Sequence, residues 1–149
     1  MKATEILKTD HRNVLDLIEQ AKKMKERNAL LLQRLYDNLK VHTTCEEQIF
    51  YPAVDGLDHH DQVQQSTSEH REIDDLLEEV MVIRAQKGMN VLLQEINALG
   101  EKLQQHIRRE EALLFPEAED QLAGSLDDLG SRIEQMKIDL RTSEYGMAA

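Results

Sequence analysis

Apolar residues, interrupted by an occasional histidine, recur along the chain at steps of three and four positions. One such series is Leu7, His11, Val14, Ile18 and Ala21. Because an α-helix turns once in about 3.6 residues, this spacing gives each helix one apolar side and one polar side. The pattern predicts four amphipathic helices, at about residues 4–26, 29–51, 61–86 and 89–119.

The breaks between the predicted helices contain residues that favour helix ends. Pro52 and Gly56 should end the second helix, because proline disfavours helical geometry in the residue before it and glycine suits a C-terminal cap. The sequence KGMN at 87–90 should turn the third helix into the fourth. The segment 123–128 separates the fourth helix from a fifth, predicted at about residues 126–141.

The predicted fifth helix has an apolar stripe of its own, formed by Leu129, Ile133, Met136 and Leu140. Ser125 followed by Asp128 resembles a capping box in which aspartate replaces the usual glutamate. We expect this helix to lie across the bundle and the tail, residues 143–149, to be frayed.

Four amphipathic helices with short connections predict an all-α fold, an antiparallel up-and-down four-helix bundle with an additional short C-terminal helix. The 149 residues include only 2 prolines and 6 glycines, which argues against a turn-rich β fold. Aromatic residues make up 3% of the chain, so the core must be largely aliphatic. The length suits a single domain over residues 1–149, with the bundle at about residues 4–119.

The chain repeats itself. The sequence HTTCEEQIFYP at 42–52 matches HIRREEALLFP at 106–116, with a histidine, a glutamate pair and an aromatic–proline pair at the same offsets. The sequence DHRNVLDLIEQ at 10–20 likewise matches EHREIDDLLEEV at 69–80. The predicted bundle therefore consists of two similar helical hairpins.

Six ionisable residues occupy positions in the apolar series, where a bundle core needs aliphatic side chains. They are His11, His42, Glu46, His70, His106 and Glu110. Unpaired, each would cost roughly several kcal/mol to bury, and no lysine or arginine shares these series at the same level. A pair of metal ions would satisfy all six.

The spacing of these residues suits two metals. In each His-x3-Glu segment the two side chains lie on one helix face, about 6 Å apart along the axis. Each segment can supply one terminal imidazole and one bridging carboxylate, and the other two helices add one imidazole each. Mixed imidazole and carboxylate ligation with an open position suits iron, or manganese in its place, better than structural zinc.

Several neighbours of these six residues have more than one role compatible with the sequence. Asp10 and Glu69 directly precede His11 and His70, and they could cap a helix or orient an imidazole. Glu47 and Glu111 are expected at the solvated helix edge, with an acidic role just outside the ligands as the alternative. Packing is expected for Cys45. Packing is also expected for Tyr36 and Tyr51, with an approach to the metals as the alternative, and solvent exposure is expected for His59 and His60.

The negative charge of the chain limits the classes of partner that it is expected to bind. The net charge of −11 and the pI near 4.9 oppose binding to nucleic acid or to anionic membranes. The sequence has no apolar run long enough to span a membrane and no signal-peptide pattern at its start. One cysteine cannot form an internal disulfide, which fits the cytoplasm.

The four segments taken together resemble the hemerythrin-like HHE cation-binding domain, over about residues 4–140. The resemblance implies a non-heme di-iron centre with an oxo or hydroxo bridge. In such a centre the terminal ligands would be His11, His42, His70 and His106, and the bridging carboxylates Glu46 and Glu110.

The chain departs from the oxygen-carrying hemerythrins, which have a His-x3-His pair on the third helix. Here His70 is followed at that spacing by Asp74, so one imidazole is missing. The set is more similar to the four-His, two-Glu site of iron–sulfur-repair di-iron proteins and of HHE proteins linked to peroxide or nitric oxide. Ferritin-like bundles use Glu-x-x-His, which does not occur in this chain.

The residues therefore predict a di-iron protein that binds or reacts with oxygen, peroxide or nitric oxide. Whether it turns over a substrate as an enzyme stays open. The alternatives are an iron reservoir or donor, and an oxygen-sensing module without turnover. A metal-free structural bundle is disfavoured by the ionisable residues in the apolar series.

Overall fold

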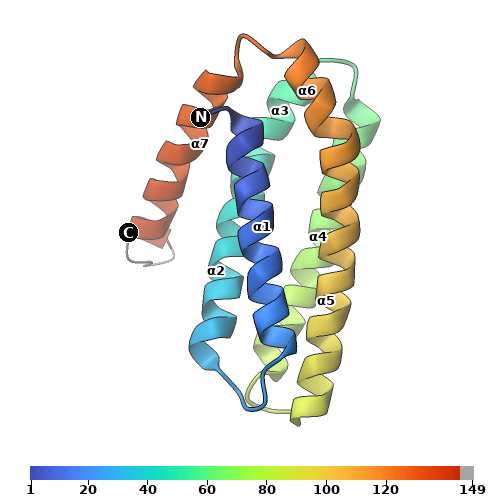
Figure 1. Ribbon diagram of the computed structural model, residues 1–149, viewed down its shortest axis with the longest axis vertical. Helices are drawn as coiled ribbons and strands as arrows, with labels where there is room; N and C mark the ends of the chain where they lie inside the picture. Colours follow the sequence, from blue (N-terminus) through green and yellow to red (C-terminus); the bar gives the residue numbers. More distant parts are fainter. Residues whose placement is uncertain (145–149) are drawn as a thin grey trace.

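Four long helices run side by side in alternating directions in the computed structural model, which describes residues 1–144 (Figure 1). They are α1 (Ala3–Lys22), α2 (Ala29–Cys45), α4 (His60–Ile83) and α5 (Met89–Arg109). The described residues contain no strand. The predicted all-α bundle with a further C-terminal helix is confirmed, and each predicted helix end is within a few residues of the observed one or continues into a further turn.

Helices α2 and α5 each continue into one turn of π-helix. These turns are η1 (Glu46–Phe50) and η2 (Glu110–Leu114), and they lead into the short helices α3 (Tyr51–Asp55) and α6 (Phe115–Gln121). Pro52 lies in the first turn of α3, directly after the π turn, and the helix continues through it. The prediction that Pro52 ends the helix is thus wrong, whereas Gly56 does cap it.

The C-terminal helix α7 (Leu126–Asp139) packs along α1 and α2 rather than across the bundle (Figure 1). A third π turn, η3 (Leu140–Glu144), follows it, and the rest of the expected frayed tail lies outside the described residues. The predicted capping box is wrong, because the Ser125 side chain makes no cap hydrogen bond. Gly130 lets α7 approach the start of the chain, since a Cβ there would lie 2.0 Å from the carbonyl oxygen of Met1.

Two apolar clusters fill the interior. One contains aliphatic residues such as Val14, Leu35, Leu77 and Leu99. The other lies against α3, α6 and α7 and contains residues such as Leu7, Phe50, Phe115 and Ile133. Burying one such side chain contributes about 1.5–3 kcal/mol, so the clusters fix the helices on both sides of the layer that contains His11.

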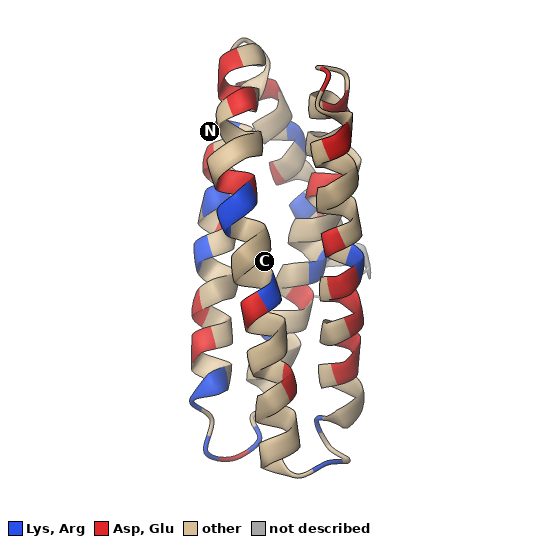
Figure 2. Ribbon diagram, turned by 90° about the vertical axis from the view of Figure 1, so that its right-hand side faces the viewer, with Lys and Arg blue, Asp and Glu red and all other residues tan. Residues whose placement is uncertain are grey.

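Acidic and basic positions occur along the helices, and the helix at the right of Figure 2 has mostly acidic ones. Acidic residues outnumber basic ones, 29 to 18, over the whole sequence. Within the described part of the chain, no helix is both long enough and apolar enough to cross a membrane.

Candidate metal centre

Six buried side chains meet between the four long helices. They are the six predicted from the sequence: His11, His42, Glu46, His70, His106 and Glu110, none more than 3% exposed. They form two groups that share Glu46 and Glu110, one completed by His11 and His42, the other by His70 and His106. Within each group, one donor atom from every residue lies within 4.8 Å of the others.

Two of the helices each bring an imidazole and a carboxylate to the same point. Residues four apart lie on one side of a helix, so His42 and Glu46 face inward together. Nε2 of His42 is 3.0 Å from Oε1 of Glu46, and Nε2 of His106 is 3.5 Å from Oε2 of Glu110. The repeated His-x3-Glu spacing is therefore used in the same way in both halves.

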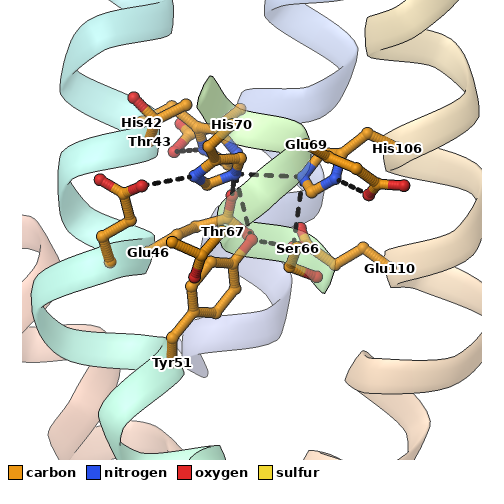
Figure 3. A network of polar contacts seen from close by, with 12 residues as sticks. His42, Thr43, Glu46, Tyr51, Ser66, Thr67, Glu69, His70, His106 and Glu110 are labelled. Atoms are coloured by element: carbon orange, nitrogen blue, oxygen red, sulfur yellow. Dashed lines mark hydrogen bonds and ion pairs between the residues drawn. The ribbon is translucent and has the colours of Figure 1, made fainter. Parts of the chain in front are cut away.

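The other two helices add one imidazole each. Nε2 of His11 is 3.1 Å from Oε1 of Glu110, and Nε2 of His70 is 3.2 Å from Oε1 of Glu46. The Nε2 atoms of His70 and His106 face each other at 3.1 Å (Figure 3). The inner nitrogens and carboxylate oxygens thus converge on a small volume.

Some of these inner atoms make no well-directed hydrogen bond among the described residues, although several of them face an oppositely charged group at 3.0–3.2 Å. They are Nε2 of His11, both carboxylate oxygens of Glu46, and Oε1 of Glu110. Leaving a buried polar group unsatisfied costs about 1–3 kcal/mol, and more where the group is charged. Imidazole nitrogens and carboxylate oxygens with unused lone pairs, held close together, are the donor set that a transition-metal cation takes. The residues present therefore fit a metal.

Each imidazole is held from outside by a second carboxylate, here called an outer carboxylate. The four pairs, with their Nδ1–oxygen distances, are His11 with Glu111 (2.6 Å), His42 with Asp10 (3.1 Å), His70 with Glu47 (3.2 Å) and His106 with Glu69 (2.7 Å). Every outer carboxylate directly neighbours one inner residue in sequence but contacts the imidazole on the next helix. The series runs from α1 to α2, α4, α5 and back to α1, so it closes around the site.

The outer carboxylates fix the direction of the imidazoles. A carboxylate that accepts the Nδ1–H leaves the Nε2 lone pair of a neutral imidazole pointing inward, as metal-binding histidines require. The expectation that Asp10 and Glu69 could orient an imidazole is confirmed. For Glu47 and Glu111, the structure agrees with the alternative of an acidic outer role rather than with a solvated edge alone: each is partly exposed but contacts a buried histidine.

Tyr51 is a further member of the site, which agrees with the alternative that it approaches the donor set rather than with packing alone. Its buried hydroxyl donates to Oε2 of Glu110 at 2.5 Å and lies 3.1 Å from Nε2 of His70 (Figure 3). The cause is the π turn, in which the Tyr51 N–H bonds to the Glu46 carbonyl and residues five apart share a face. Its counterpart in the repeat, Phe115, has no hydroxyl and stacks on the His11 ring instead.

The charges of the inner residues depend on one another. Burial alone would lower the pKa of His42, but the carboxylates of Glu46 and Asp10 raise it to about 10. Burial also opposes protonation of His70, yet Glu46 and Glu47 raise its pKa to about 10. Without a metal, protons on these imidazoles balance the buried carboxylates.

The two inner carboxylates differ in pKa. Burial favours the protonated form of both, but the positive charge of His42 lowers the pKa of Glu46 well below its usual value. Burial and the negative charge of Glu46 raise the pKa of Glu110. Burial and these two carboxylates also raise the pKa of Tyr51, so its hydroxyl keeps its proton.

The remaining candidates lie away from the centre. Cys45 is fully buried, and burial raises the pKa of its thiol to about 12, which agrees with a packing role. The Tyr36 hydroxyl donates to Glu78 at the surface. His60 is exposed as expected, but the His59 side chain is mostly covered, so the expectation of solvent exposure is correct for only one of the two.

The chain matches the family described as Hemerythrin HHE cation binding domain over residues 2–143. No curated protein matches it significantly. Among solved structures it is similar to a hemerythrin HHE cation binding domain-containing protein from Mycobacterium kansasii. That likeness has a TM-score of 0.76 and 22% identity over 97% of this chain and 94% of that chain, and it shows the fold alone. Because the family match spans almost the whole sequence, the chain belongs to the hemerythrin HHE cation-binding domain family.

Proposed function

We propose that the protein holds two iron ions at this centre and uses them to bind or transform a small molecule. The observation that carries the proposal is the pair of buried donor groups that share Glu46 and Glu110. His11 and His42 would complete one metal position, and His70 and His106 the other. A bound pair of iron ions would supply electrons and open coordination positions for oxygen, peroxide or nitric oxide.

The protein's own residues prepare the site for such a pair. The outer carboxylates hold the Nδ1 protons and keep the Nε2 atoms inward. The apolar clusters on both sides limit the access of water, which strengthens electrostatic interactions inside. Tyr51 keeps a proton at the middle of the donor set, against Glu110.

The residue at position 74, in the third long helix α4, is an argument for reaction with the small molecule over reversible oxygen carriage. Asp74 occupies the position of the second histidine of oxygen carriers and forms an ion pair with Lys40 at 2.8 Å, at the surface. Among the described residues, four imidazoles lie at the centre. With fewer ligands a metal pair keeps more open positions, which favours reaction with the small molecule.

The test is metal analysis followed by spectroscopy. We expect about two iron ions per chain after anaerobic reconstitution, and an optical spectrum that changes on adding oxygen, peroxide or nitric oxide. Rapid loss of peroxide or nitric oxide would indicate an enzyme, whereas a stable and reversible oxygen adduct would indicate a carrier or sensor. Fewer than about one iron per chain would contradict the di-iron proposal.

A further inference from the structure

The two halves of the repeat differ at one position beside the site. The segments HTTCEE and HIRREE align His42 with His106 and Glu46 with Glu110, which places Cys45 opposite Arg109. A guanidinium supplies a positive charge and a neutral thiol does not, so any positive charge beside the first half of the site must come from another residue.

In the second half, Arg109 supports the outer carboxylate. Its Nη2 donates to Oε1 of Glu69 at 2.5 Å and to Oγ of Ser66 at 3.1 Å. The same Oε1 of Glu69 lies 2.7 Å from Nδ1 of His106 (Figure 3). A positive charge, a carboxylate and an imidazole therefore form a line that ends at the second metal position.

In the first half, the positive charge comes from outside the repeat. Cys45 packs against α7, with its Sγ 4.0 Å from the carbonyl oxygen of Ile133. One turn further along α7, Lys137 forms an ion pair with Oδ1 of Asp10. The other oxygen of Asp10 is 3.1 Å from Nδ1 of His42, so the same line of three groups ends at the first metal position.

Asp10 and Glu69 are the two outer carboxylates that form an ion pair with a lysine or arginine among the described residues, and they are also the two least exposed. Lys8 and Arg12 act on Glu111 from further away. The side chains of Asp10 and Glu69 are 12% and 15% exposed, whereas those of Glu47 and Glu111 are 40% and 35% exposed. Water can stabilise the latter pair. A nearly buried carboxylate needs a cation, because an unpaired buried charge is strongly destabilising.

We propose that α7 is part of the metal centre and that Lys137 is a positioning residue for the metal that His42 binds. Lys137 holds Asp10, which in turn contacts His42. Arg109 has the same role in the second half, where it holds Glu69 against His106. The inference rests on the proposed metal-binding function and deepens it. It assigns the C-terminal helix to one metal position of the two.

The main experiment measures cobalt(II) binding to metal-free protein by optical titration, with folding checked by circular dichroism. The titration should show two successive cobalt-binding steps. Lys137→Met should weaken one of them about tenfold, which is the lower limit of the loss expected when a group that supports a metal ligand is removed. Lys137→Arg should restore the parent affinity. Met136→Ala shortens another α7 side chain, one that packs against the second apolar cluster and makes no ion pair, and it should leave both steps unchanged.

Substitution of Arg109, the equivalent residue in the second half, and two sets of double variants show which metal position each binding step belongs to. Arg109→Met should weaken the other step. In a His42→Ala background, Lys137→Met should have no further effect, whereas Arg109→Met still should. In an Asp10→Asn background, the effect of Lys137→Met should fall below about twofold, because interacting residues are not additive.

The proposal would be overturned by parent-like binding in Lys137→Met, by an equal loss at both steps, or by the same loss in Met136→Ala. Persistence of the full effect after Asp10→Asn would also overturn it. The parent titration separately tests the function itself: two cobalt ions per parent chain support the metal centre whatever Lys137 does, and no cobalt binding rejects both.

Discussion

At the scale of single residues, the hydroxyl of Tyr51 marks the difference between the two halves of the centre. Tyr51→Phe removes a donor to the buried Glu110 and copies Phe115, the residue that the other half already has. We expect the metal-free protein to lose about 1–3 kcal/mol in its free energy of unfolding, because a buried carboxyl oxygen of Glu110 would be left without its donor. Both metals should still bind, because Tyr51 is outside the proposed ligand set.

Urea denaturation and metal analysis of Tyr51→Phe would measure both quantities. Tyr36→Phe is the control, because its hydroxyl contacts Glu78 at the surface and its loss should change stability by less than about 0.5 kcal/mol. Equal effects in the two variants would mean that the buried contact to Glu110 contributes nothing.

The imidazoles allow a second test at this scale. His42→Ala removes an inner nitrogen, and we expect metal affinity to fall by roughly 100-fold or more, beyond the effect of losing an outer partner. His60→Ala is the matched control: His60 also pairs with a carboxylate, Asp55, but is exposed and distant from the centre. Metal titration of both variants decides, and similar affinities would show that His42 is not a ligand.

The sequence could predict the inner residues because they interrupt an apolar series that must be buried. His11 and Glu46, for example, stand where aliphatic residues belong. The outer contacts could not be predicted in the same way. Glu47 and Glu111 look like solvated residues on their own helices, and their partners lie on neighbouring helices. Such contacts depend on how the helices are rotated against each other.

At the scale of elements, the periodic apolar pattern predicts the helices but does not predict the π turns. Glu46–Phe50 still reads as α-helix, because a single i→i+5 turn changes the periodicity by only one residue. The π turn is what brings Tyr51 to the site. The place of α7 was also hidden, because it depends on two small residues, Cys45 and Gly130, that let it lie close to its neighbours.

The docking of α7 gives a prediction at this scale. Gly130→Ala places a Cβ 2.0 Å from the Met1 carbonyl oxygen, a backbone atom that cannot move cheaply. Overpacking of this kind costs about 1–3 kcal/mol, more than alanine gains in helix propensity. We therefore expect lower stability in urea and faster amide hydrogen exchange in α7. Gly124→Ala, whose Cβ would meet nothing within 4 Å, should be neutral, and equal behaviour of the two would contradict this docking.

At the scale of the whole molecule, an acidic chain buries carboxylates in its centre and balances them with protons or metal. The pKa values of His42 and His70 are raised to about 10 in the folded protein, from about 6.5 in an unfolded chain. A group with a raised folded pKa stabilises the fold fully below its unfolded pKa. That stabilisation is lost as the pH rises through the folded value. The metal-free protein should therefore lose stability between about pH 6.5 and 10.

Metal binding should reverse this dependence. A metal ligates the neutral imidazole, so it replaces the protons of His42 and His70, and its affinity rises as those protons become easier to remove. The difference in melting temperature between cobalt-loaded and metal-free protein should then widen from pH 6.5 to pH 9, measured at equal protein concentration. In His42→Ala the widening should shrink, because one of the two titrating imidazoles is gone. A constant difference across this range would show that protons and metal do not compete for these imidazoles.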